Sequence, residues 1–249
     1  MSPSRRLVRW ALLAVLTVPS LASAQLYNQE KESPRNHQIE IKFGPYKPSL
    51  YAKGASNTPY DSVFGGSSMF IAKLEYDYQF FQKGGSLAVG FEMGIASITG
   101  DGLVAGTSTA STDETKFRFV PFSVSLVYHM DLFATKWDVP LVPYVKVGFD
   151  YVVWWITDGV GDIAHYKDPK TGEDFEGRGD TWGYHVAAGL KILLDVLSPS
   201  MARTFDVEVG VNNSYIFAEF LYADISDFGS GGSFNLGAIT GLFGLAFEF

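Results

Sequence analysis

The sequence predicts an all-β chain that folds as a closed antiparallel up-and-down transmembrane β-barrel of eight strands. Hydrophobic residues make up 47% of the chain, yet no stretch after residue 24 is long and apolar enough for a membrane helix. The apolar residues instead alternate with polar or small ones in short segments, as they do in the strands of membrane barrels. The chain also has 26 glycines and 15% aromatic residues, which favours a glycine- and aromatic-rich β protein.

Residues 1–24 have the organisation of a cleaved signal peptide. Arg5, Arg6 and Arg9 form a basic start, an apolar run covers 10–18, and Ala22 and Ala24 supply the small residues of a cleavage site. The apolar run is too short to cross a bilayer as a helix. We therefore expect the mature chain to begin at Gln25, with 25–36 as a flexible polar lead before a barrel over 37–249.

Charge and cysteine content exclude several classes of protein. The chain has no cysteine, and hence neither a disulfide framework nor a lipoprotein acylation site. Without the three signal arginines, 16 basic residues remain against 27 acidic ones, a net charge of −11. This acidity argues against nucleic acid as a partner.

Alternation at period two predicts the first three strands, at 37–47, 68–80 and 86–98. The second is the clearest, because aromatic and aliphatic residues alternate there with Lys73, Glu75 and Asp77. Three successive charges on one face cannot point into lipid, so this face fits a polar lumen. Residues 83–85, Lys-Gly-Gly, predict a tight turn before the third strand.

The fourth strand, at 116–128, changes phase. Phe117 and Phe119 are apolar at odd positions, whereas Phe122 and Val124 are apolar at even ones, with Pro121 between them. Because proline cannot donate to a strand ladder, this pattern predicts a bulge at Pro121 that shifts the alternation by one residue.

Four further strands are predicted at 143–157, 181–194, 204–220 and 234–249. In the last of them, Ile239, Phe243, Leu245, Phe247 and Phe249 share one face. We expect this face to adjoin Ile39, Ile41 and Phe43 of the first strand and so to close the barrel. The long connections follow the first, third, fifth and seventh strands, which places them all on one side of the sheet.

An eight-stranded barrel has an interior that side chains can fill. The inward faces of the predicted strands place charges of both signs there, and such charges must be paired or hydrated. The predicted lumen set is Lys73, Glu75, Asp77, Glu92, Lys146, Asp150, His185, Lys191, Asp206 and Glu208. Two interpretations remain open, a structural filling of the lumen and a narrow path for water or ions.

No catalytic, cofactor-binding or metal-binding residue is predicted. The histidines at 37, 129, 165 and 185 lie in separate elements, and none has a serine or an acid at a recognisable spacing. His165 is interpreted as a surface residue and His185 as a packed one. The acidic segment 168–174 lacks the register of a calcium loop.

The signal segment, the eight alternating strands and the terminal Phe249 together resemble small outer-membrane barrels of the OmpA/OmpX type. The segments 41–49 and 140–148 are similar to those of predicted barrels from myxobacterial-type envelopes. The resemblance implies location in the outer membrane of a Gram-negative bacterium, contact with its lipids, and assembly by machinery that recognises Phe249, Phe247 and Leu245.

Pattern alone names no activity. The first hypothesis is a non-enzymatic envelope protein with a side-chain-filled lumen, whose four extracellular loops contact envelope proteins, ligands or other cells. The alternatives are a narrow solute or ion channel, a barrel component of an envelope complex such as a gliding-motility machine, and, least favoured, a lipid-modifying enzyme.

Overall fold

A computed structural model describes residues 35–48, 59–64, 66–103, 110–137, 139–167, 172, 174–230 and 234–249. The chain divides into two units, Met1–Glu32 and Ser33–Phe249, and every described residue belongs to the second. The predicted signal peptide and most of the predicted lead therefore lie outside the described residues.

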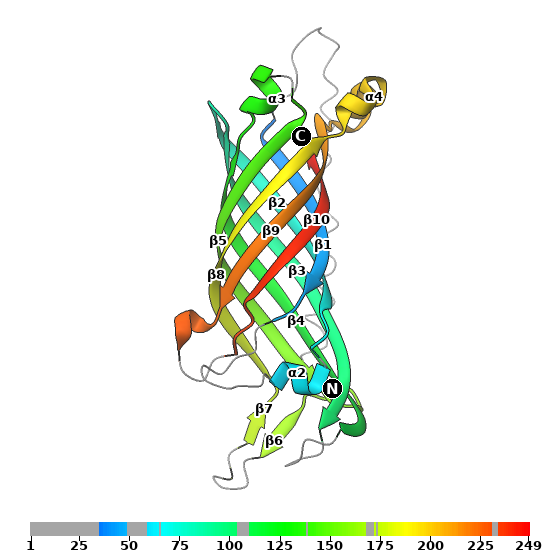
Figure 1. Ribbon diagram of the computed structural model, residues 1–249, viewed down its shortest axis with the longest axis vertical. Helices are drawn as coiled ribbons and strands as arrows, with labels where there is room; N and C mark the ends of the chain where they lie inside the picture. The colour runs from blue at the N-terminus through cyan, green and yellow to red at the C-terminus, as the bar shows by residue number, and fades with distance from the viewer. Residues whose placement is uncertain are drawn as a thin grey trace, which may run out of the picture. The chain divides into compact units, whose positions relative to one another are not determined.

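Eight antiparallel strands form a closed barrel (Figure 1). In chain order they are β1 (His37–Tyr46), β2 (Met69–Gln82), β3 (Ser86–Leu103), β4 (Ala110–His129), β5 (Leu141–Thr157), β8 (Arg178–Leu193), β9 (Asn213–Ile225) and β10 (Ala238–Glu248). Each strand pairs with its neighbours along the chain, and β1 pairs with β10. The predicted fold class and strand number are confirmed.

The barrel has two distinct ends. At the end where β10 finishes, which we call the terminal end, lie α3 (Leu132–Trp137), η1 (Asp195–Leu197) and α4 (Pro199–Val209). At the opposite, loop end lie α2 (Pro59–Phe64), the hairpin of β6 (His165–Lys167) and β7 (Asp174–Glu176), and η2 (Asp227–Gly229). The tight turn predicted at 83–85 is present, with positive φ at Gly84 and Gly85.

The barrel closes through the predicted pair of strands. Ile39 is opposite Phe247, Ile41 opposite Leu245, and Phe43 opposite Phe243. The backbone of Phe249 completes the seam, since its N–H donates to the carbonyl of His37 at 2.8 Å and its carbonyl accepts from the N–H of His37 at 3.1 Å.

The strand predicted at 204–220 is wrong in its first half. Residues 199–209 form α4, and the strand there, β9, begins only at Asn213. Pro199 at the start of the helix and Gly210 with φ of 79° at its end supply start and stop signals that outweigh the alternation of Phe205, Val207 and Val209. Asp206 and Glu208 therefore lie on this helix and not in the lumen.

The bulge predicted at Pro121 is also wrong. The register of β4 runs unchanged past it, with Val120 opposite Val153 and Pro121 opposite Val152 on β5. The odd positions of β4 from 117 to 129 all face inward, so that Phe117 and Phe119 are buried inside the barrel. The apparent change of phase arises because the interior becomes apolar towards the loop end. The register shifts recorded along the β2–β3 and β3–β4 pairs lie at 79/81 and 101/103.

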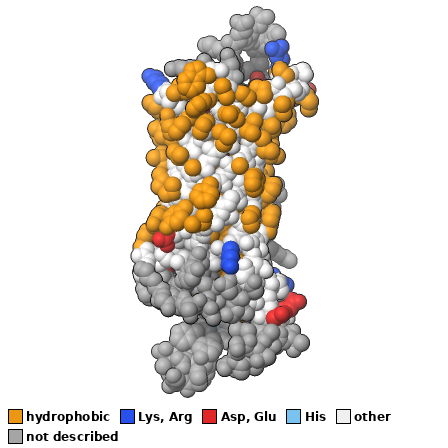
Figure 2. Space-filling view, in the orientation of Figure 1, with side chains coloured by type: hydrophobic (Ala, Val, Ile, Leu, Met, Phe, Trp, Pro, Cys, Tyr) orange, Lys and Arg blue, Asp and Glu red, His pale blue; other side chains and the backbone are white. Residues whose placement is uncertain are grey.

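The outer face of the barrel is apolar (Figure 2). Its outward side chains include Ile41, Phe70, Leu74, Phe80, Phe91, Met93, Ile95, Phe122, Leu126, Val147, Ile216, Phe220, Phe243 and Leu245, all exposed on the isolated chain. A continuous apolar surface of this extent requires an apolar surrounding, and the closed sheet leaves no unpaired strand edge in it. The described barrel is therefore a membrane-spanning one. No described helix is long and apolar enough to cross a membrane.

Removal of Phe249 is expected to lower the yield of folded barrel more than deletion of the β6–β7 hairpin, 165–176, because it removes the hydrogen bonds that hold the end of the seam. The measurement is the fraction of protein with heat-modifiable migration on a gel. F249A keeps the backbone and loses the ring, so it separates the contribution of the backbone hydrogen bonds from that of the aromatic side chain. Wild-type yield from the truncated chain would contradict this role for the seam.

Candidate functional site

The centre of the barrel interior contains a buried network of ion pairs, which we call the charge layer. Its members come from six of the eight barrel strands and are Glu40, Lys42, Lys73, Glu75, Asp77, Glu92, Lys146, Lys191 and Glu219. Each exposes 8% or less of its surface. They meet there because each occupies an inward position of its strand, at the period of two.

Lys146 on β5 connects three strands. Its Nζ lies 2.8 Å from Glu40 Oε2, 2.6 Å from Glu75 Oε2 and 3.3 Å from Glu219 Oε2. The two glutamates at 40 and 75 come from β1 and β2, on the far side of the lumen. This single ammonium group therefore bridges opposite walls of the barrel.

The other three lysines extend the network. Lys42 contacts Glu75 at 2.6 Å and Glu92 at 2.5 Å, and Lys73 contacts Glu92 at 2.7 Å. Lys191 contacts Glu40 at 2.7 Å. Ionised groups removed from water need such close partners, since an isolated buried charge costs several kcal/mol.

Neutral donors satisfy the remaining acids. Seven buried carboxylates, the layer's five with Asp150 and Glu248, face four buried lysines among the described residues, so ion pairs alone do not suffice. Glu248 accepts from Gln79 at 2.9 Å, Asn213 at 2.6 Å and Tyr215 at 3.1 Å. These groups lie at the terminal end and seal the lumen there with hydrogen bonds.

Most of the predicted lumen set is confirmed. Lys73, Glu75, Asp77, Glu92, Lys146, Asp150, His185 and Lys191 are all buried inside the barrel, whereas Asp206 and Glu208 are not. Sequence reasoning missed Glu40, Lys42, His129, Glu219 and Glu248. The inward parity of the first and last strands already indicated Glu40, Lys42 and Glu248. Glu219 lay within the predicted strand but was missed because Phe205, Val207 and Val209, which belong to α4, had assigned the odd positions to the outer face.

Glu40, Asp77 and His129 lie close enough together for one metal ion to contact all three. The Lys191 ammonium, however, is 2.7 Å from Glu40 Oε1 and 2.8 Å from His129 Nε2. Gln38 also donates to Glu40 at 2.6 Å and to Asp77 Oδ2 at 3.0 Å. A protein cation and an amide thus already serve these ligand atoms, and only Asp77 Oδ1 is buried without a hydrogen-bond partner among the described residues.

A serine, a histidine and an aspartate meet towards the loop end of the charge layer. His185 Nδ1 lies 2.9 Å from both oxygens of Asp150, and its Nε2 lies 3.1 Å from Ser125 Oγ. Gly148 makes this possible, because a Cβ there would lie 2.4 Å from the imidazole ring. The three residues come from β4, β5 and β8 and have no shared spacing in sequence, so only the fold reveals them.

This group has the residue types of a hydrolase triad but no room for a substrate. The void beside His185 and Asp150 is about 10 Å³, which holds at most about one water molecule. An acyl substrate needs a reacting carbon next to the serine and donors around its oxygen. The described geometry therefore supports packing for His185, as the sequence predicted. His165 is exposed on β6, which also agrees with its interpretation as a surface residue.

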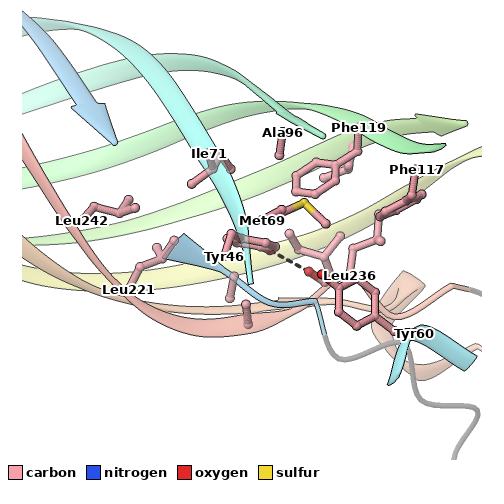
Figure 3. Packing of buried hydrophobic residues seen from close by; sticks show 14 of the residues in the cluster. Tyr46, Tyr60, Met69, Ile71, Ala96, Phe117, Phe119, Leu221, Leu236 and Leu242 are labelled. Atoms are coloured by element: carbon pink, nitrogen blue, oxygen red, sulfur yellow. Dashed lines mark hydrogen bonds between the residues drawn. The ribbon is translucent and has the colours of Figure 1, made fainter. Parts of the chain in front are cut away.

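The loop end of the lumen is filled by the apolar plug (Figure 3). It consists of Tyr46, Tyr60, Met69, Ile71, Ala96, Phe117, Phe119, Val152, Ala187, Leu221, Ala223, Ile225, Leu236, Ala238 and Leu242. Tyr46 packs against Phe119 at 5.3 Å between ring centres and donates to the carbonyl of Leu236 at 2.6 Å. Tyr60 from α2 adds a buried ring whose hydroxyl donates to Ser67 at 2.6 Å.

Replacing Lys146 by methionine is expected to destabilise the barrel by roughly 3–5 kcal/mol, because three buried carboxylates lose a shared cation. The measurement is the urea midpoint in detergent, with exposed Lys83→Met as the matched control. Adding E75Q to K146M should recover part of the loss, since it removes one uncompensated charge. A K146M midpoint equal to that of K83M would contradict the role of the network.

Asp131, between β4 and α3, makes stability depend on pH. Burial raises the pKa of its carboxyl to about 6, although a hydrogen bond with Ser86 opposes the shift. The folded chain thus favours the neutral form of the Asp131 carboxyl. The stability that this preference contributes is complete below the ordinary pKa of 3.8 and is lost as the pH rises through the raised pKa of about 6. D131N should therefore stabilise the protein more at pH 7.5 than at pH 4, with urea midpoints as the measurement and exposed D162N as control. An equal difference between the urea midpoints of D131N and wild type at the two pH values would contradict this pH dependence.

No protein-family model and no curated protein matches this sequence. Solved structures with a similar fold include OprG from Pseudomonas aeruginosa, at 15% identity and a TM-score of 0.49, with 88% of this chain and 99% of that one covered. Neisserial surface protein A has 13% identity and a TM-score of 0.46, with 86% of this chain and 96% of that one covered. The attachment invasion locus protein Ail of Yersinia pestis has 12% identity and a TM-score of 0.43, with 86% of this chain and 97% of that one covered. The closed eight-stranded antiparallel sheet of this chain makes it a β-barrel similar to these outer-membrane proteins.

Proposed function

We propose that the protein is a non-enzymatic outer-membrane barrel of a Gram-negative bacterium that presents its loop end as a contact surface and does not conduct solutes. The observation that carries this proposal is the filling of the lumen. Two barriers of opposite chemistry, the charge layer and the apolar plug, follow each other along the barrel axis.

Each barrier opposes transport for a different reason. An ion that entered the charge layer would have to displace side chains held at 2.5–3.3 Å from their partners. In the apolar plug an ion would lose its water without gaining polar partners, which is costly in an apolar surrounding. A water-filled path would require both barriers to move.

The two ends of the barrel suggest its orientation in the membrane. We propose that the terminal end faces the periplasm, after export by a signal peptide cleaved near residue 24 and recognition of Phe249, Phe247 and Leu245 by the assembly machinery. The loop end then faces the exterior. Exposed acids there, including Asp158, Asp162 and Asp174, favour a cationic partner surface over an anionic one.

A narrow channel is the second candidate, and the polar charge layer is the observation that favours it. Purified wild-type protein in planar bilayers is expected to give no discrete conductance steps, with heat-modifiable migration confirming that the inserted protein is folded. The double variant Y46A/F119A, which thins the apolar plug alone, shows whether the charge layer blocks by itself. Reproducible steps from the wild type that change size in K146M would refute the filled-lumen proposal and establish the channel.

A further inference from the structure

A groove on the outer wall of the barrel has no counterpart in the function proposed above. It has a volume of about 360 Å³ and runs across β3, β4, β5 and β8. We call it the outer-wall groove; its lining is Phe91, Glu92, Met93, Phe122, Ser123, Val124, Phe149, Tyr151 and Trp182. The outward members are apolar, so the groove opens into the hydrocarbon region of the membrane.

The strand register arranges these side chains in two rows. Phe91, Val124 and Phe149 are consecutive partners in one row, and Met93, Phe122, Tyr151 and Trp182 form the next. Val124 is the smallest outward residue in the set and lies between two phenylalanines. The groove therefore forms where a short side chain interrupts a surface of long ones.

Aromatic packing holds one wall of the groove in place. Trp182 lies 4.3 Å from Tyr151 and 5.3 Å from Phe149 between ring centres, and the ring of Phe228 stacks on Phe149 at 6.0 Å. Phe228 reaches this position through a turn in which it and Asp227 both have positive φ, and Asp227 accepts from the backbone N–H of Trp182 at 2.8 Å. Such backbone conformations are costly for non-glycine residues and persist only where contacts stabilise them.

Two cations lie farther along the outward face of β4, towards the loop end. Arg118 and Lys116 are outward and half-buried, and neither has an ion-pair partner among the described residues. Arg118 lies four residues from Phe122, about 13 Å along the strand. Its neighbour in register is Trp155, an amphipathic residue typical of the membrane interface.

Four described charged residues lie near these cations on the outer wall: Arg178, Asp180, Glu114 and Asp101, which is opposite Glu114. Arg178, opposite Trp155, is paired with Glu176. Asp180 lies on β8, two strands from β4 and hence about 10 Å away. Glu114 is exposed two residues beyond Lys116, farther from the groove. The outward face of β4 thus presents an apolar slot in the membrane and, at its border, two cations that have no ion-pair partner within the described part of the chain.

We propose that the outer-wall groove binds one phosphate-bearing glycolipid of the outer leaflet, with an acyl chain along Val124 and a phosphate on Arg118 and Lys116. A guanidinium fork and an ammonium group suit phosphate oxygens, and the apolar slot suits a saturated chain. This site rests on the orientation proposed above, which puts the loop end in the leaflet that holds such glycolipids.

Native mass spectrometry of the full chain, refolded in detergent, tests the site with diphosphoryl lipid A as probe. Wild type should retain one lipid A. K116Q/R118Q and V124F should each weaken binding at least about tenfold, the first by removing charge and the second by filling the slot. The matched controls are K83Q at the terminal end and A218F on the outer face of β9, both expected within about twofold of wild type. Heat-modifiable migration confirms that each variant is folded.

Further ligands identify the headgroup. Dephosphorylated lipid A should bind wild type as weakly as intact lipid A binds K116Q/R118Q, and the variant should lose no further affinity for it. Equal binding of the two lipids by wild type, unchanged binding by K116Q/R118Q, or displacement by an equal concentration of phosphatidylglycerol would overturn the proposal. A protein dimer that forms in the wild type and is lost in V124F would also overturn the proposal. Binding in detergent does not depend on the orientation of the barrel in the membrane. The orientation is tested separately, by cleavage of the loops with protease added to intact cells.

Discussion

Closure of the sheet is the constraint on which the rest of the structure depends. In hydrocarbon every backbone N–H and C=O must be paired within the protein, so the first and last strands have to meet. The seam between β1 and β10 does this from Gln38 to Phe43, and Phe249 completes it. Closure then fixes which residues face inward, because neighbouring positions on a strand point to opposite sides of the wall.

An interior defined in this way has to be filled, and its chemistry changes along the axis. Near the middle, charges from strands that are distant in sequence satisfy one another, with Lys146 reaching glutamates on β1 and β2. Towards the loop end the same inward positions carry aromatic and aliphatic side chains. A lumen filled by polar side chains alone would leave the loop end open to water. A lumen filled by apolar side chains alone would leave the buried charges without partners. The two layers together fill the described interior of the barrel.

The outer wall is less uniform than its apolar composition suggests. A small residue, Val124, leaves a slot between larger neighbours, and a turn after β9 folds back so that Phe228 packs against one wall of it. Towards the loop end the same strand carries two cations, Lys116 and Arg118, that have no ion-pair partner among the residues that the structure describes. Such a surface distinguishes among membrane lipids, whereas a smooth apolar wall would contact all of them alike.

The sequence by itself determined the number of strands, the faces of most of them and eight of the ten predicted lumen residues, because alternation at period two is a local property of the chain. It failed at Pro121 and over 204–212, where alternation was taken to imply one environment or one secondary structure. Phe117 and Phe119 face inward only because the loop end of the lumen is apolar. Partnerships such as Ser125 with His185 and Asp150 depend on closure and register, which unite residues far apart in sequence, and only the tertiary structure decides them.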